Sequence, residues 1–368
     1  MRIAFYAPLK PPDDPIPSGD RRLARLFLDA LRAAGHQPFV ASRLRSYDGA
    51  GDPPLQARLA AAGERDAGAL IARWRRAADA TPELWFTYHL YYKAPDWLGP
   101  AVSAALGIPY VVAEASCAAK RAGGVWDRGH REVMRALGRA DAVFGLNPVD
   151  RACVVPLLRA PARWIALPPF LEAAAYEAPA RLATPATRLI TVAMMRPGDK
   201  LASYRLLGAA LTRLIELPWS LDVIGDGAAR SEVAAALAPL GTRVRWRGAL
   251  DDQAVAKALA AADLFVWPAI NEALGMALLE AQASGLPVVA GTSGGVAGIV
   301  ADGETGLLAP PGDIAAFAAA VRTLVLDGGR RAAMGPAARR KALAEHDLPI
   351  AARRLAAALA PLVRVPAA

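Results

Sequence analysis

Two glutamates flank a glycine turn in the C-terminal half of the chain. Glu272 precedes a turn that ends at Gly275, and Glu280 lies about two helical turns further along roughly the same face. The amides of Leu274, Gly275 and Met276 begin a helix and have no partner inside it, and the helix dipole adds positive potential there. Such a turn is well suited to bind a phosphate or diphosphate. Because carboxylates accept hydrogen bonds from sugar and ribose hydroxyls, the combination indicates a nucleotide-sugar site.

The neighbouring elements would place this turn at the edge of a parallel sheet. Residues 264–267 are an apolar run of strand length, residues 276–283 carry apolar side chains at helical spacing, and residues 286–290 form a second buried strand. The turns of such a crossover lie at the carboxyl ends of the strands, where open parallel sheets bind ligands. A simpler interpretation stays open on these residues alone, with Glu272 as a helix-entry residue and Glu280 as a solvated surface charge.

A longer pattern surrounds the two glutamates. It consists of Glu272, Glu280, Ala281, residues 285–289, Gly294, Gly295, residues 302–308 and residues 311–313. This pattern resembles the signature of the family-4 retaining glycosyltransferases, which have the GT-B fold. The resemblance implies that Glu272 contacts the transferred sugar, that the amides of residues 274–276 hold the diphosphate, and that Glu280 holds the ribose.

A second loop supplies positive charge. Residues 189–194 are predicted to form a strand and residues 201–214 a helix, and the loop between them contains Arg196 and Lys200. A planar guanidinium and a compact ammonium both suit a leaving phosphate. The loop is similar to the family's Arg-and-Lys loop, which neutralises the donor diphosphate, although a leucine follows Lys200 where the family has glycine. The resemblance therefore implies catalytic roles for both cations.

Further residues of the C-terminal half lie beside the donor in the resembled family. Gly225 belongs to a glycine turn after a predicted strand, but this turn lacks the third glycine of a dinucleotide motif and is a weak signal by itself. Arg247 and Gly248 end a strand that lies against the nucleobase in relatives. All three are predicted to bind the donor.

The N-terminal half offers candidates for the acceptor side. His89 follows a predicted strand and either packs as a structural residue or faces the site as a catalyst. In many relatives a histidine occupies the position of Ala115, so either His89 substitutes for it, or Glu114 takes the polar role, or the acceptor is unusual. Lys120 either holds an anionic acceptor or is a solvated charge. Gly19 is what remains of the family's glycine-rich first loop and is predicted to touch substrate.

Length and composition bound the architecture. A chain of 368 residues predicts two domains, each able to bury a core. We expect an α/β fold with two Rossmann-like, doubly wound domains that face each other across a cleft. Residues 1–171 would form the acceptor-side domain, residues 172–348 the donor domain, and residues 349–368 a helix that packs back on the first domain. The proline- and alanine-rich residues 172–187 would form the linker.

Charge and rare residues restrict the partners. Residues 1–170 carry 23 basic and 16 acidic residues, so they hold +7 of the net charge of +9. An anionic membrane surface, a phosphorylated acceptor or a solvated face without a partner all remain open, whereas nucleic acid is disfavoured because no nucleic-acid-binding motif is present. Four histidines without metal-ligand spacing argue against a protein-held metal, and two cysteines fit a reduced setting. With no apolar run of membrane-spanning length and no signal peptide, we expect a cytoplasmic protein, in contact at most with the inner face of the membrane.

The resemblance and the residues together predict a retaining, metal-independent glycosyltransferase without a cofactor. It would move a sugar from a nucleotide-diphosphate sugar to a hydroxyl of a sugar, a glycolipid or a small molecule, in assembly of the bacterial cell envelope or a polysaccharide. Two other hypotheses remain. One is a nucleotide-sugar epimerase or a phosphorylase on the same fold, and the other is a catalytically silent binding subunit.

Overall fold

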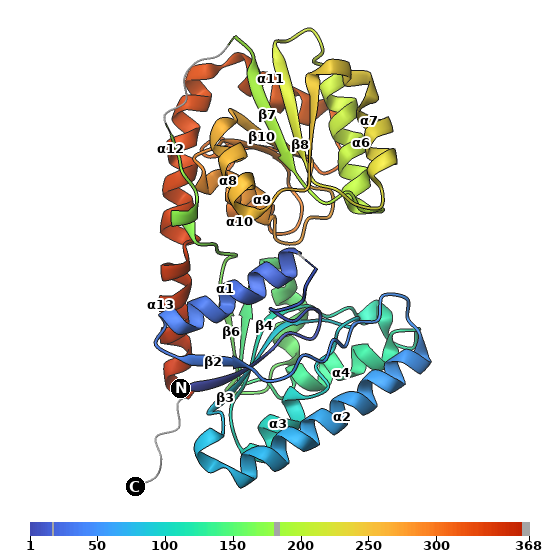
Figure 1. Ribbon diagram of the computed structural model, residues 1–368, viewed down its shortest axis with the longest axis vertical. Coiled ribbons are helices and arrows are strands. Elements are labelled where there is room, and N and C mark those ends of the chain that lie inside the picture. The colour runs from blue at the N-terminus through green and yellow to red at the C-terminus, as the bar shows by residue number, and fades with distance from the viewer. Residues whose placement is uncertain (17, 180–184, 363–368) are drawn as a thin grey trace. The chain divides into compact units, whose positions relative to one another are not determined.

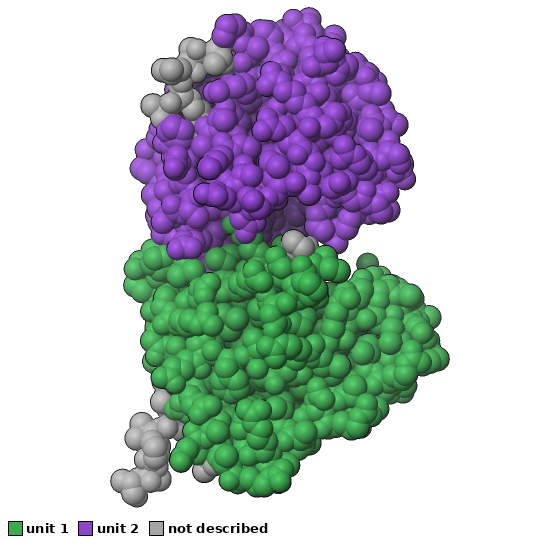
Figure 2. Space-filling view, in the orientation of Figure 1, with its two compact units in different colours: residues 1–168, 348–368 green, residues 169–347 purple. Residues whose placement is uncertain are grey.

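The computed structural model describes residues 1–16, 18–179 and 185–362. It divides into two compact units, in which unit 1 comprises Met1–Pro168 with Leu348–Ala368 and unit 2 comprises Pro169–Asp347 (Figure 2). Each unit contains one six-stranded sheet whose paired strands are all parallel. The C-terminal helix therefore belongs to the same unit as the N-terminal strand.

Unit 1 has the strand order β2-β1-β3-β4-β5-β6. Helices α1 and α13 pack together, and helices α2, α3 and α4 form a second layer (Figure 1). Its strands are nearly continuous apolar runs because helices cover both faces of the sheet. The elements are β1 (Arg2–Tyr6), α1 (Gly19–Ala33), β2 (Gln37–Val40), α2 (Pro53–Arg76), β3 (Leu84–Leu90), α3 (Gly99–Leu106), β4 (Tyr110–Ala115), α4 (Asp127–Leu137), β5 (Ala142–Gly145), α5 (Arg151–Val154), β6 (Arg163–Ala166) and α13 (Leu348–Leu359), with short 3₁₀ turns at Ala78–Ala80, Ala119–Arg121, Pro148–Asp150, Val155–Leu157 and Ala360–Leu362.

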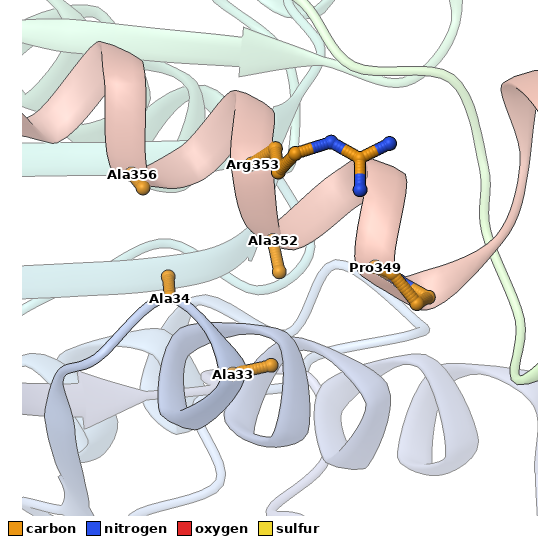
Figure 3. Close-up of a pocket in the computed structure, with 6 residues that line it drawn as sticks. All are labelled: Ala33, Ala34, Pro349, Ala352, Arg353 and Ala356. Carbon is orange, nitrogen blue, oxygen red and sulfur yellow. The ribbon is translucent and has the colours of Figure 1, made fainter.

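Small residues allow α13 to approach α1 closely. Figure 3 shows a shallow hollow between the end of α1 and the first turns of α13. Its lining residues are Ala33, Ala34, Pro349, Ala352, Arg353 and Ala356. The contact ties the last described helix to the first one.

Unit 2 has the strand order β12-β11-β10-β7-β8-β9. Helix α6 packs with α7 and with α11, and α8, α10 and α12 pack with α9 (Figure 1). The elements are β7 (Thr187–Val192), α6 (Asp199–Thr212), β8 (Trp219–Ile224), α7 (Arg230–Leu237), β9 (Val244–Gly248), α8 (Asp252–Ala261), β10 (Leu264–Trp267), α9 (Met276–Ala283), β11 (Val288–Gly291), α10 (Val296–Ile299), β12 (Gly306–Ala309), α11 (Ile314–Leu326) and α12 (Gly328–Glu345), with 3₁₀ turns at Ala173–Ala175 and Ala238–Arg243.

The structure contains elements that the sequence pattern did not indicate. Strands β6 and β12 have four residues each and are too short to show a period. The sequence did not indicate helix α12, because two glycines stand at its start and Pro336 lies inside it. A Cβ on Gly335 would lie 2.5 Å from the carbonyl oxygen of Gly285, so the glycine of this helix permits close packing on the turn after α9.

The segment expected to be a linker is partly packed. Ala173 and Tyr176 are buried in the core of unit 2, and Ala173 N donates to Asp347 Oδ1 at 3.0 Å. Residues 180–184 of the same segment lie outside the described residues. The described part therefore already belongs to unit 2.

An ion pair fixes the register between β7 and β10. Arg188 donates to the Asp263 carboxylate from Nη2 at 2.6 Å and from Nε at 2.9 Å. The backbone N of Arg188 donates to the same carboxylate at 2.8 Å. Burial alone would raise the pKa of Asp263, but the hydrogen bonds from Arg188 outweigh it and hold that pKa below the ordinary value.

We expect Asp263→Asn to lower the free energy of unfolding by about 2 kcal/mol at pH 7, because it removes charge-assisted bonds at a mostly buried group. The folded-state pKa is depressed, so this stabilisation is present above the unfolded pKa and is lost as the pH falls through the folded pKa. Denaturant titrations at pH 7 and pH 3 check both points. Glu216→Gln is the control, because its partner Arg322 forms an exposed pair that adds little stability. An equal loss at both pH values would contradict this account.

Candidate functional site

The site in unit 2 centres on the side chain of Glu272. Its Oε2 atom accepts hydrogen bonds from Lys200 Nζ at 2.5 Å and from the indole Nε1 of Trp267 at 3.1 Å. The ammonium of Lys200 also lies 5.4 Å from the centre of the Trp267 ring. These three side chains come from α6, the β10–α9 turn and the end of β10, so they join two loops at the carboxyl edge of the sheet.

Backbone and side-chain bonds hold the same two loops together. Asn271 Nδ2 donates to Asp199 Oδ2 at 3.0 Å, and the amide of Ile270 donates to Ser203 Oγ at 3.0 Å. Ala269 and Asn271 have φ angles of 55° and 49°, which is the left-handed region that side chains rarely adopt. Strain of this kind persists only where surrounding contacts enforce it and concentrates at functional sites.

The N-terminus of α9 presents free backbone donors beside Glu272. Gly275 has φ 72° and caps the helix without a side-chain bond, so this position favours glycine. The first amides of a helix have no acceptor within it. Among the described residues, no hydrogen bond is found from the amides of Leu274, Gly275 or Met276, which agrees with the predicted anion-binding role.

A second glycine turn lies against this loop. Gly294 has φ 52°, and a Cβ there would lie 2.0 Å from the carbonyl oxygen of Glu272. The amide of Gly295 donates to the carbonyl oxygen of Ala273 at 3.0 Å. The glycine pair after β11 is therefore required so that the backbone of the Glu272 loop can approach.

Glu280 is buried on α9 and is 6% exposed. The interpretation of Glu280 as a solvated surface charge is therefore wrong. Glu272 is likewise more than a helix-entry residue, because it pairs with Lys200. Their predicted roles toward sugar and ribose stay predictions.

The other residues predicted to bind the sugar donor also follow or end strands of the unit 2 sheet, but the two arginines among them differ in what they contact. A Cβ on Gly225 would lie 1.9 Å from the carbonyl oxygen of Ala193, and the Gly225 amide donates to Gly248 at 2.8 Å, so the ends of β7, β8 and β9 meet there. Arg196 is exposed on its loop. Arg247 Nη1 instead lies 3.3 Å from Asp222 within β8, because its strand position directs it to the neighbouring strand.

A second set of polar residues gathers at the carboxyl edge of the unit 1 sheet. His89 Nδ1 lies 3.0 Å from Asp20 Oδ1, and the charges of Glu114 and Asp150 act on His89. His89 and Glu114 occupy neighbouring strands and both have left-handed backbones, with φ 66° and 61°. Glu114 Oε2 is shielded from solvent and has no hydrogen-bond partner among the described residues.

Burial and like charges perturb this cluster. Burial raises the pKa of Glu114 to about 7, with Asp150 and Asp20 adding to the rise and His89 opposing it. Burial also raises the pKa of Asp150 to about 6. Burial alone would lower the pKa of His89, but the hydrogen bond that its ring donates to Asp20, together with the surrounding carboxylates, raises that pKa. Carboxyl groups whose pKa values are raised by burial and like charges concentrate at functional sites, which makes this cluster a candidate for handling a hydroxyl.

The remaining unit 1 candidates differ from one another. Gly19 begins α1 after the capping residue Ser18, and a Cβ there would meet nothing within 4 Å, so the backbone does not require glycine. Lys120 is exposed in a 3₁₀ turn. Ala115 is 3% exposed within β4, so its position offers no polar group.

The cysteines differ from the expectation. Cys117 and Cys153 form a disulfide, with Cα atoms 6.0 Å apart, which differs from the reduced setting expected from the cysteine count. Cys117 follows β4 and Cys153 lies in α5, and the sheet brings these distant positions to one edge. Spacing alone gave no signal for this pairing.

The structure adds residues that the sequence pattern missed. Trp267 belongs to the Glu272 cluster of unit 2, and Asp20 and Asp150 belong to the His89–Glu114 cluster of unit 1. Each of the three has an ordinary position at a strand or helix end. Among the described residues, no group of three or more His, Cys, Asp or Glu side chains is arranged to hold a metal ion. No helix in the described part of the chain is long and apolar enough to cross a membrane.

Comparison with known proteins connects this site to a family. Residues 186–327, which carry the whole Glu272 cluster, match the family model described as glycosyl transferases group 1. These residues belong to the glycosyl transferases group 1 family.

Two curated relatives support the assignment of this glycosyl transferases group 1 domain. Sulfoquinovosyl transferase SQD2 of Arabidopsis thaliana is 36% identical over 140 residues, covering 37% of this chain and 27% of that protein. D-inositol 3-phosphate glycosyltransferase of Kineococcus radiotolerans is 34% identical over 242 residues, covering 58% of this chain and 55% of that protein. The chain thus matches from about a quarter to about half of the length of these relatives.

A solved structure extends the similarity to the complete fold. HepE from Anabaena, determined in complex with UDP, superposes with a TM-score of 0.74 at 16% identity, covering 98% of this chain and all of that one. The predicted GT-B fold is confirmed.

The glycine after β11 provides a test of the loop contact. We expect Gly294→Ala to destabilise the protein by at least about 2 kcal/mol, because alanine adopts φ 52° poorly and its Cβ would clash with Glu272. Gly298→Ala is the matched control, since a Cβ there meets nothing within 4 Å. Thermal unfolding compares the two, and equal stability of both variants would show that the Glu272 loop does not depend on this approach.

Ionisation of Glu114 provides a second test. Its folded pKa is raised, so the folded state binds more protons and stability declines as the pH rises from about 4.5 to about 7. We expect Glu114→Gln to remove this decline and to gain up to about 3 kcal/mol at pH 8, with little change at pH 4. Melting temperatures across this range measure the effect, with exposed Glu64→Gln as the control. A pH-independent difference would exclude a raised pKa as its cause.

Proposed function

We propose that this protein is a retaining glycosyltransferase that uses a nucleotide-diphosphate sugar as donor. The observation that carries the proposal is the Lys200–Glu272–Trp267 contact beside the free amides of α9, within a glycosyl transferases group 1 domain. The UDP complex of HepE, a protein of the same fold, supports a nucleotide donor. Transfer as the reaction type is supported by the two sequence relatives, which are both glycosyl or sulfoquinovosyl transferases.

Each part of the unit 2 site has a chemical role in this proposal. The α9 amides and Lys200, together with Arg196, stabilise the charge that develops on the leaving diphosphate. Glu272 positions the transferred sugar, and Glu280 binds the ribose hydroxyls. When the sugar hydroxyls bind Glu272, they replace or share the Lys200 contact, which leaves the ammonium available to the phosphate.

The reaction forms a bond between the acceptor oxygen and the anomeric carbon and breaks the bond from that carbon to the diphosphate. The diphosphate leaves with the electron pair, and a diphosphate oxygen on the same face takes the acceptor proton. Retention of the anomeric configuration follows from this same-face course. The proposal includes no protein-held metal and places the enzyme in assembly of cell-envelope or polysaccharide glycoconjugates.

A ligand screen with one buried and one exposed glutamate tests the donor site. We expect one family among UDP-, GDP- and ADP-linked sugars to raise the melting temperature, with about 2.7 kcal/mol of stabilisation at 100 times the dissociation constant. Glu280→Gln should abolish the shift, whereas Glu304→Gln, an exposed glutamate of the same unit, should retain it. Absence of a shift with every nucleotide sugar would refute the donor assignment.

Product analysis tests the reaction itself. NMR of the product made with the identified donor should show retained configuration, and chelation with EDTA should leave the rate unchanged. Binding without transfer to any acceptor would instead favour the silent binding subunit, and turnover of the donor without an acceptor would favour an epimerase.

A further inference from the structure

A row of aromatic rings crosses the polar edge of unit 1. The ring of His89 lies 4.9 Å from that of Tyr91, Tyr91 lies 5.7 Å from Tyr92, and Tyr92 lies 5.6 Å from Trp126. All four rings are partly exposed. The row therefore links the His89–Glu114 cluster to the segment that precedes α4.

Two cations share the far end of this aromatic row. Arg121 Cζ lies 5.0 Å from the centre of the Tyr92 ring and 4.8 Å from that of Trp126. Lys93 Nζ lies 5.9 and 5.0 Å from the same two rings. The rings attract both cations, yet they supply no negative charge that would offset the repulsion between them.

The nearby carboxylates are engaged elsewhere. Asp48 accepts from three backbone amides and from Gln56 Nε2, and Asp127 accepts from the amide of Gly123 and pairs with Arg131. Within the described residues, neither Lys93 nor Arg121 forms an ion pair, and the buried Nε of Arg121 has no hydrogen-bond partner. Two cations that lie against the same two rings without a counter-charge indicate a place for an anion.

The rings under these cations are held in position. The indole Nε1 of Trp126 donates to the carbonyl oxygen of Asp48 at 3.2 Å. A Cβ on Gly51 would lie 2.5 Å from Val125, and a Cβ on Gly129 would lie 2.1 Å from the carbonyl oxygen of Tyr92. The platform is thus formed before any ligand arrives, which reduces the entropy cost of binding.

We propose that Lys93 and Arg121 bind a phosphate group of the acceptor, whose hydroxyl lies at the His89–Glu114 cluster. This inference rests on the proposed glycosyltransferase function and names its substrate class, a phosphorylated sugar or polyol. A phosphomonoester carries about two negative charges at neutral pH and matches two cations, whereas a carboxylate carries one. The guanidinium of Arg121 supplies a donor fork for two phosphate oxygens.

The opposite charges at the two ends of the aromatic row give the acceptor one orientation. Asp20, Glu114 and Asp150 repel a phosphate and accept hydrogen bonds from hydroxyls. Tyr91 lies between the ends, and its partly exposed ring offers a surface on which a sugar ring packs. A phosphorylated hydroxyl compound satisfies all three parts of the row at once.

Titration of the full-length protein with inorganic phosphate and with glycerol 3-phosphate tests the anion site without any donor. We expect saturable binding by calorimetry that weakens at least about tenfold in Lys93→Gln and Arg121→Gln, and that Arg121→Lys partly retains. Arg128→Gln, an exposed arginine of α4 outside the cluster, is the control with the same loss of charge. Because the unit 2 loop also suits phosphate, Arg196→Gln is titrated in parallel. Binding that Arg196→Gln abolishes and Arg121→Gln does not would overturn the inference.

A binding experiment with lipid vesicles distinguishes a lipid phosphate from a soluble phosphorylated acceptor. Co-sedimentation with phosphatidylcholine vesicles containing phosphatidic acid, lost in Arg121→Gln, identifies a lipid phosphate, whereas binding of glycerol 3-phosphate alone identifies a soluble acceptor. No phosphate-dependent binding in either arm would overturn the inference. Failure of the nucleotide-sugar screen with intact phosphate binding would instead remove the proposed function and leave the anion site.

Discussion

The contact between Lys200 and Glu272 is the interaction on which the unit 2 site depends. It joins the start of α6 to the turn before α9, and Trp267 at the end of β10 donates to the same carboxylate. A cation with affinity for phosphate and a carboxylate with affinity for hydroxyls thus hold each other in the free protein. In the proposed function, a nucleotide sugar would offer a partner of the correct charge to each of them, so that binding would replace one compensated pair with two.

Close backbone approach is the second constraint on this site. Glycines at 225 and 294 allow carbonyl oxygens of neighbouring loops to come within the space that a Cβ would occupy. The loop after β8 can therefore pack directly on the loop after β7, and the loop after β11 on the loop after β10, at the carboxyl edge of the sheet. The loop before α9 is held in place by this packing, and among the described residues no hydrogen bond is found from the amides of Leu274, Gly275 or Met276.

Unit 1 repeats the parallel-sheet plan but places different chemistry at the same edge. His89 and Glu114 sit on strained strand ends beside Asp20 and Asp150, and the cations on aromatic rings belong to other residues of the same unit. One end of the aromatic row is acidic and the other end is basic. A solvated surface without a function would not need this separation of charge. This polarity also explains where part of the basic excess of the N-terminal half is located, since Lys93, Lys120 and Arg121 all lie there.

The sequence by itself determined the α/β class, the order of most strands and helices, and the donor-side motif around Glu272 and Glu280, because hydrophobic period and local turn chemistry are short-range properties. Only the tertiary structure decided that Glu280 is buried, that Lys200 pairs with Glu272, and that Arg247 points to Asp222. Asp20, Asp150 and the Cys117–Cys153 pair likewise became visible only in three dimensions. These residues are distant in sequence, and parallel strand order alone brings their loops to one edge of a sheet.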